Sequence, residues 1–122
     1  MAVKSYLPMF RPGDTVTFGV TTAVTAGQAV EVSATADMSV APAAAASAKY
    51  VGVAGHDAAV GDKLTVEVGK PIHELKAVGA ITRGQKLEAA AAGGVRTLAA
   101  GAAIFLALSS ATDGTLVRAI QL

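Results

Sequence analysis

The chain has 122 residues, enough for one small domain and too few for two. Ten basic against nine acidic residues give a formal charge of +1, which argues against a dedicated binder of polyanions. The absence of cysteine excludes disulfides, thiolate metal sites and thiol nucleophiles. Because 52% of the residues are hydrophobic and only 4% aromatic, the core must be built from small side chains.

Residues 1–12 are predicted to form an extended N-terminal arm. They contain Tyr6, Phe10 and two of the three methionines, and prolines at 8 and 12 disfavour helix. The segment lacks the long apolar core of a secretory signal, which predicts a protein made in the cytoplasm. Two interpretations stay open: an edge strand or wrap over the domain's own core, or an arm that adds to another chain.

A four-residue pattern of Gly, Asp or Gln, any residue, and Val or Leu recurs at Gly13–Val16, Gly27–Val30, Gly61–Leu64 and Gly84–Leu87. Glycine supplies the positive φ that ends a turn, and the short polar side chain can bond the local backbone. The branched residue then begins a strand. Because the spacings are unequal, the pattern indicates a recurring turn-to-strand device and not a solenoid period.

Alternation of branched and polar residues predicts strands after the first three of these turns, with Val16, Val30 and Leu64 on buried faces. Further short strands are predicted at Lys49–Gly55 and Pro71–Leu75. The C-terminal end is predicted to be a hairpin, with strands over residues 103–109 and 115–122. Residues 117–120 do not alternate cleanly, which predicts a strand covered on both faces.

Two alanine-rich stretches interrupt the strands. Ala41–Ala48 is expected to be a loop or a single helical turn, and Glu88–Gly93 a short helix stopped by Gly93 and Gly94. The whole pattern predicts an all-β fold for residues 13–122, a single small β-barrel or sandwich of roughly eight to ten short strands with at most one or two short helices.

The chain offers little for catalysis. His56 and His73 lie in different predicted elements and lack zinc-motif spacing, and no cofactor-binding motif is present. His56-Asp57 is interpreted as a strand-end turn in which Asp57 caps backbone groups, not as an acid–base dyad. The sequence therefore predicts no enzyme, no metal site and no cofactor.

The sequence leaves two other binding functions open. A small nucleic-acid-binding β-barrel of a phage is the alternative hypothesis, although basic residues are spread from Lys4 to Arg118 without a cluster. A biotinyl or lipoyl carrier domain is a weaker one, because Lys70 and Lys76 lack the expected hairpin context. The longest apolar run, Leu98–Leu108, is too short for a membrane span.

The ordered motifs along the chain resemble a known family. They are Met1–Lys4, Arg11–Asp14, Val24–Gln28, Tyr50–Ala59 and Gly79–Gln85. Together they resemble the capsid decoration proteins of tailed phages, also called head-stabilising or cement proteins, over nearly the whole chain.

The resemblance implies a non-enzymatic virion protein, most often a homotrimer, on the outer surface of the head. Its partner would be the major capsid protein, bound after the shell expands, with no direct contact with nucleic acid or membrane. The family supplies no catalytic residues. It implies a capsid-contact role for the arm residues Val3, Lys4, Tyr6, Leu7, Pro8, Met9, Phe10 and Arg11.

Overall fold

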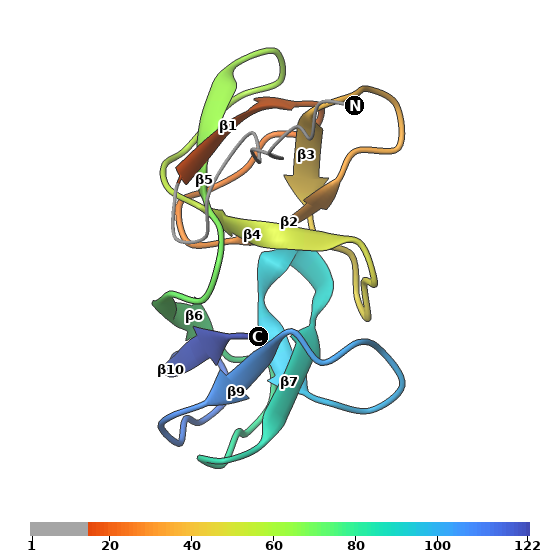
Figure 1. Cartoon of the computed structure of the whole chain (residues 1–122). Helices are drawn as coiled ribbons and strands as arrows, with labels where there is room; N and C mark the ends of the chain where they lie inside the picture. The colour runs from red at the N-terminus through yellow and green to blue at the C-terminus, as the bar shows by residue number, and fades with distance from the viewer. Residues whose placement is uncertain (1–14) are drawn as a thin grey trace, which may run out of the picture.

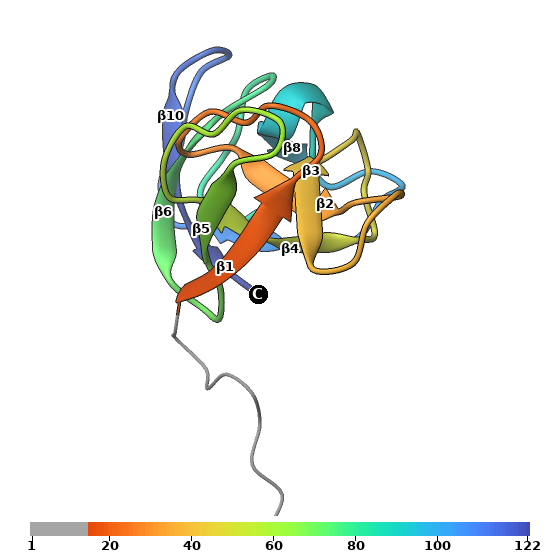
Figure 2. The ribbon, with the colours of Figure 1, turned by 90° about the horizontal axis from the view of Figure 1, so that it is seen from above.

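The computed structural model describes residues 15–122, which contain ten strands and one short 3-10 helix. Five strands form a closed barrel in the order β1-β3-β2-β4-β5: β1 (Thr15–Val20), β2 (Ala29–Val32), β3 (Ser39–Pro42), β4 (Tyr50–Ala54) and β5 (Lys63–Glu67). The other five form a second sheet in the order β6-β10-β9-β7-β8: β6 (Ile72–Lys76), β7 (Lys86–Ala89), β8 (Val95–Thr97), β9 (Phe105–Ala107) and β10 (Leu116–Gln121). Figure 1 shows the barrel above the second sheet, and Figure 2 looks onto the barrel strands β1–β5 from above.

The predicted all-β class is confirmed, and the predicted alternation is visible in the burial of individual strands. In β1, Val16 and Val20 are buried while Thr15 and Thr17 are exposed. In β5, Leu64 and Val66 are buried. Branched residues at every second position thus fill the barrel interior, as period-two patterning requires.

The second sheet repeats the strand pairing of the barrel. Antiparallel β1–β5, which pairs Thr15 with Glu67, recurs as β6–β10, which pairs Ile72 with Ile120. The other antiparallel contacts recur in the same way: β2–β3 corresponds to β7–β8, β2–β4 to β7–β9, and β4–β5 to β9–β10. Even the parallel β1–β3 contact, Val20 with Val40, recurs as the bridge Ala77 to Val95. The described chain is therefore a tandem repeat of one five-stranded unit, unit 1 being residues 15–67 and unit 2 residues 72–121.

The recurring glycine turns occupy two equivalent places in each unit. At Gly27, Gly61 and Gly84, φ lies between 84° and 88°. The Gln or Asp that follows each glycine accepts a hydrogen bond of 2.8–3.0 Å from the backbone N–H of the residue three positions before that Gln or Asp. The fourth place is Gly114-Thr115, where the Thr115 hydroxyl donates to the Thr112 carbonyl at 2.7 Å. The predicted turn device is confirmed at the three copies within the described residues. Its unequal spacing arises because each unit holds two such turns; the Gly13 copy begins outside those residues.

Two local predictions were wrong, and a third holds over shorter bounds. Glu88 and Ala89 belong to strand β7, and only Ala91–Gly93 forms a 3-10 turn (η1), because ladder pairing with β8 and burial of Leu87 and Ala89 override the helix propensity of the segment. The expected loop is shorter than predicted: residues 43–48 lie outside the strands, whereas residues 41 and 42 belong to β3. Strand β8 was not predicted. Finally, Val117, Ala119 and Gln121 of β10 are buried, whereas Leu116 and Arg118 are exposed and Ile120 is half-buried, so only one face of this strand is fully covered.

One hydrophobic cluster joins the two units. Phe105 of unit 2 is fully buried, and the Tyr50 ring of unit 1 lies edge-on to it with centroids 5.3 Å apart. The Tyr50 hydroxyl donates to Gln121 Oε1 at 2.8 Å, and burial raises the pKa of this phenol so that it stays neutral. Ala29, Ala43 and Val53 of unit 1 pack into the same cluster. A second cluster fills the barrel of unit 1.

Among the described residues, no helix has the length and apolarity that crossing a bilayer demands.

Candidate functional site

The eight predicted arm residues, Val3, Lys4, Tyr6, Leu7, Pro8, Met9, Phe10 and Arg11, all lie outside the described residues. The described chain begins at Thr15 with β1, which pairs with β5 along its length. The capsid-contact role of the arm therefore stays a prediction.

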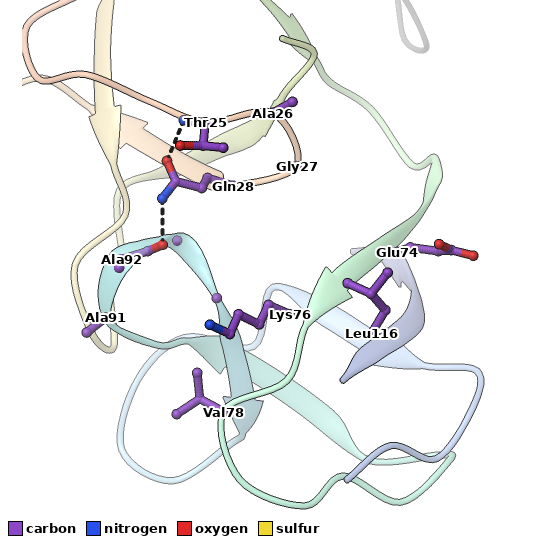
Figure 3. Close-up of a pocket in the computed structure, with 12 residues that line it drawn as sticks. Thr25, Ala26, Gly27, Gln28, Glu74, Lys76, Val78, Ala91, Ala92 and Leu116 are labelled. Carbon is purple, nitrogen blue, oxygen red and sulfur yellow. Dashed lines mark hydrogen bonds between the residues drawn. The ribbon is translucent and has the colours of Figure 1, made fainter. Parts of the chain in front are cut away.

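A crevice of about 390 Å³ lies where the two units meet (Figure 3). One wall is the turn Thr25–Gln28 of unit 1, and the other is built from unit 2 by Glu74, Lys76, Val78, Leu116 and the η1 segment. The lining combines one carboxylate, one ammonium group, an amide and exposed aliphatic side chains. Such a set can recognise a polypeptide surface, but it contains no nucleophile paired with a general base.

Gln28 fastens the turn to unit 2. Its Oε1 accepts from Thr25 N at 2.8 Å, and its Nε2 donates to the Ala92 carbonyl of η1 at 2.9 Å (Figure 3). The sequence predicted the first bond from the turn pattern. It could not predict the second, which joins residues 64 positions apart.

Gly93 makes this junction sterically possible. Its φ is +75°, and a Cβ added there would lie 2.6 Å from Gln28 Cβ and 3.0 Å from the Ala29 carbonyl oxygen. We expect Gly93→Ala to lower the free energy of unfolding by about 3 kcal/mol or more, since left-handed strain and overpacking combine. Gly79→Ala is the matched control, because φ is +81° there and the space is open; its expected loss is about 1–2 kcal/mol. Urea denaturation measures both, and equal losses would contradict the tight junction.

Glu88 is a fully buried carboxylate that the sequence analysis assigned to a helix. Its oxygens accept from Arg96 Nε at 3.1 Å, Ala99 N at 3.1 Å and Gly101 N at 2.6 Å, which holds the loop after β8. Burial alone raises the pKa of Glu88, but these hydrogen bonds outweigh it and hold the pKa below its ordinary value. Glu31 is the equivalent residue of unit 1 and accepts from Ala44 N at 2.7 Å. Alignment of the two units by their strand pairing identifies Glu31 and Glu88 as equivalent residues.

The lowered pKa of Glu88 predicts a pH dependence of stability. Because the folded-state pKa lies below that of the unfolded chain, the carboxylate stabilises the fold above the unfolded value, and this contribution is lost as pH falls through the folded value. Glu88→Gln is expected to lower Tm at pH 7 and to flatten the fall in Tm between about pH 5 and about pH 3. Glu31→Gln, at a half-buried site with a 3.6 Å ion pair to Lys49, should lower Tm less. Thermal melts across this range decide; parallel curves for Glu88→Gln and the parent would refute the role.

The two histidines make separate contacts. His56 Nδ1 donates to the Asp57 carbonyl at 2.9 Å, and His56 Nε2 accepts from Thr65 N at 3.1 Å. The Asp57 carboxylate instead accepts from Ala26 N at 2.8 Å. Asp57 therefore caps a backbone group as expected, but in a turn 31 residues away and not in its own turn. His73 lies edge-on to Phe105 at 6.3 Å, and desolvation lowers its pKa. Within residues 15–122, no group of three metal-ligating side chains comes together.

Comparisons with known proteins found one family and one similar fold. A family model described as phage cement protein matches residues 10–120, a span that includes both units. Among solved structures, the chain is similar to the head fiber gp8.5 N base of bacteriophage phi29, with 22% identity, a TM-score of 0.72, and coverage of 89% of this chain and 93% of that one. At this identity the structural similarity shows the fold alone. No curated protein matches the chain.

Proposed function

The chain belongs to the phage cement protein family, and from this premise we propose that it binds the outside of the expanded capsid lattice and stabilises it. The observation that carries the proposal is the family match over residues 10–120, which leaves neither unit unaccounted for. The family resemblance stated from the sequence is thereby confirmed, and the chain is a structural protein of the phage head.

The finer proposal concerns partners. The major capsid protein is the proposed partner, the arm residues 1–12 the proposed contact, and residues 13–122 the β-domain that presents the arm. The domain assembles as a homotrimer on the virion surface and carries out no catalysis. A near-neutral formal charge supports dense tiling, since neighbouring copies do not repel each other strongly.

Multivalent attachment supports the mechanism physically. Several arms held by one oligomer bind the lattice together, so that weak single contacts sum to firm attachment. Bracing then follows, because each oligomer bridges neighbouring capsid subunits and must be released before they separate.

Co-sedimentation with purified capsids tests the proposal. The expected result is saturable binding to expanded, undecorated shells of the phage that encodes the chain, and none to unexpanded shells. Binding to neither shell, together with a salt-sensitive shift of short DNA, would replace the proposal by the nucleic-acid-binding alternative.

A further inference from the structure

The contact between the two units of one chain uses two different faces. We call the face of unit 1 the joining face; it includes the turn residue Gln28 together with Ala43 and Val53. We call the face of unit 2 the receiving face; it includes Ala89 and the η1 segment. Besides the Gln28–Ala92 bond, Ala46 N donates to the Ala89 carbonyl at 2.8 Å across this contact. The contact is heterologous, because the two faces are built from different parts of the repeated unit.

The tandem repeat means that each face occurs a second time, without a partner among residues 15–122. Unit 2 carries a second joining face, in which Leu98 is equivalent to Ala43 and Leu106 to Val53. The equivalence is fixed by hydrogen bonding: Ala43 N donates to Ala29 O as Leu98 N donates to Lys86 O. Strand register gives the second equivalence: Val53 pairs with Glu67 in unit 1, and Leu106 pairs with Ile120 at the same place in unit 2.

Unit 1 likewise carries a second receiving face. There Val32 is equivalent to Ala89, because Val32 pairs with Val40 as Ala89 pairs with Val95. Residues 33–38 of unit 1 are equivalent to the η1 segment, because they connect β2 to β3 as the η1 segment connects β7 to β8.

Equivalent positions differ in exposure as an uncovered interface predicts. Ala89 is fully buried whereas Val32 is 48% exposed, and Met38 in the adjoining loop is 55% exposed. Val53 is 3% exposed whereas its counterpart, the larger Leu106, is only half-buried, as is Leu98. Exposed apolar residues thus occur at the positions that are covered in the other unit.

Polar groups on the two unpaired faces are complementary. Gln85, equivalent to Gln28, uses its Oε1 in the same turn bond to Thr82 N, and its Nε2 makes no hydrogen bond to a described residue. Arg83 and Lys86 lie close to Gln85 in the sequence and are exposed. On the receiving face of unit 1, Asp37 is exposed in the loop of residues 33–38. Opposite charges therefore meet if one face is placed on the other in the intramolecular manner.

We propose that the joining face of unit 2 packs on the receiving face of unit 1 in a second copy of this chain, which repeats between copies the contact seen within one. Leu98 and Leu106 cover Val32 and Met38, and Gln85 forms a hydrogen bond with the loop of residues 33–38. A heterologous contact of this kind closes into a ring or continues as a filament. A ring of three copies would be the homotrimer proposed above.

Sedimentation velocity on the isolated chain tests the inference, with Leu106→Glu and Val32→Glu placing one charge on each face. The parent is expected to associate, and each variant to associate about 100-fold more weakly or worse. Val60→Glu is the matched control, because Val60 is 66% exposed and lies on neither face. It should associate as the parent does, and unchanged melting curves should show that all three variants fold.

Mixing the two interface variants gives the sharper result. Leu106→Glu keeps an intact receiving face and Val32→Glu an intact joining face, so an equimolar mixture should form a one-to-one dimer although neither variant associates alone. A monomeric parent up to its solubility limit, or association that both variants leave unchanged, would overturn the inference. The measurement uses no capsids, so its failure and the failure of capsid binding are separate outcomes.

Discussion

Deletion of residues 2–11 is expected to abolish binding to expanded capsids and to leave the fold intact. The deleted arm holds Tyr6, Leu7, Met9 and Phe10, whose burial at a contact would contribute roughly 1.5–3 kcal/mol each. Loss of even two such contacts weakens each attachment by about 100-fold or more. Co-sedimentation of the truncated and full-length chains with the same expanded shells measures the effect.

The ten strands that the structure describes lie within residues 15–122, so the truncated chain should keep its far-ultraviolet circular dichroism and its Tm. The full-length variant with Tyr6→Ala and Phe10→Ala should lose binding in the same direction without a change of length. Val60→Ala, an exposed change outside the arm, should leave binding unaltered. Unimpaired attachment of the truncated chain would rule out the arm mechanism, while leaving open contact through the β-domain.

The largest expected loss of stability comes from Phe105→Ala. Phe105 is fully buried in the cluster shared by both units, with Tyr50 on one side and His73 on another. Removing the ring leaves a cavity at the junction, and the expected loss in the free energy of unfolding is about 3–5 kcal/mol. Because domains of this size have only about 5–15 kcal/mol in total, the variant should be markedly destabilised.

Urea denaturation followed by tyrosine fluorescence, to which Tyr6 and Tyr50 both contribute, and by circular dichroism provides the measurement. Leu108→Ala is the control, since Leu108 is exposed and should change stability by less than about 1 kcal/mol. Phe105→Leu, which keeps much of the volume, should fall between the two. A loss below about 1 kcal/mol for Phe105→Ala would mean that the shared cluster does not hold the units together.

Sequence reasoning succeeded where local chemistry and burial agree. Branched residues at alternate positions predicted β1 and β5, and the Gly-Gln and Gly-Asp turns were predicted with their hydrogen bonds. The hairpin of β9 and β10 was predicted because its turn signal lies between two apolar stretches. These features depend on contacts between residues close in sequence or on a simple period.

The remaining features depend on tertiary contacts that leave no local signal. Glu88 has a side chain typical of an exposed helix, yet three donors 8, 11 and 13 residues further along the chain stabilise it inside the fold. The tandem repeat is hidden because equivalent core positions carry different side chains, such as Phe18 and Leu75 or Val20 and Ala77. Strand pairing reveals it, since pairing depends on the backbone.

The confinement of strand pairing to each unit has a consequence for synthesis on the ribosome. The described partners of β1–β5 all lie between residues 15 and 67, so the barrel can close before Phe105 has been translated. Until then Tyr50 and the other cluster residues of unit 1 have no cover, and a nascent chain stalled at this stage exposes apolar surface to its neighbours on the polysome. Translation speed between residues 68 and 105 thus becomes a determinant of yield, separate from the stability of the finished protein.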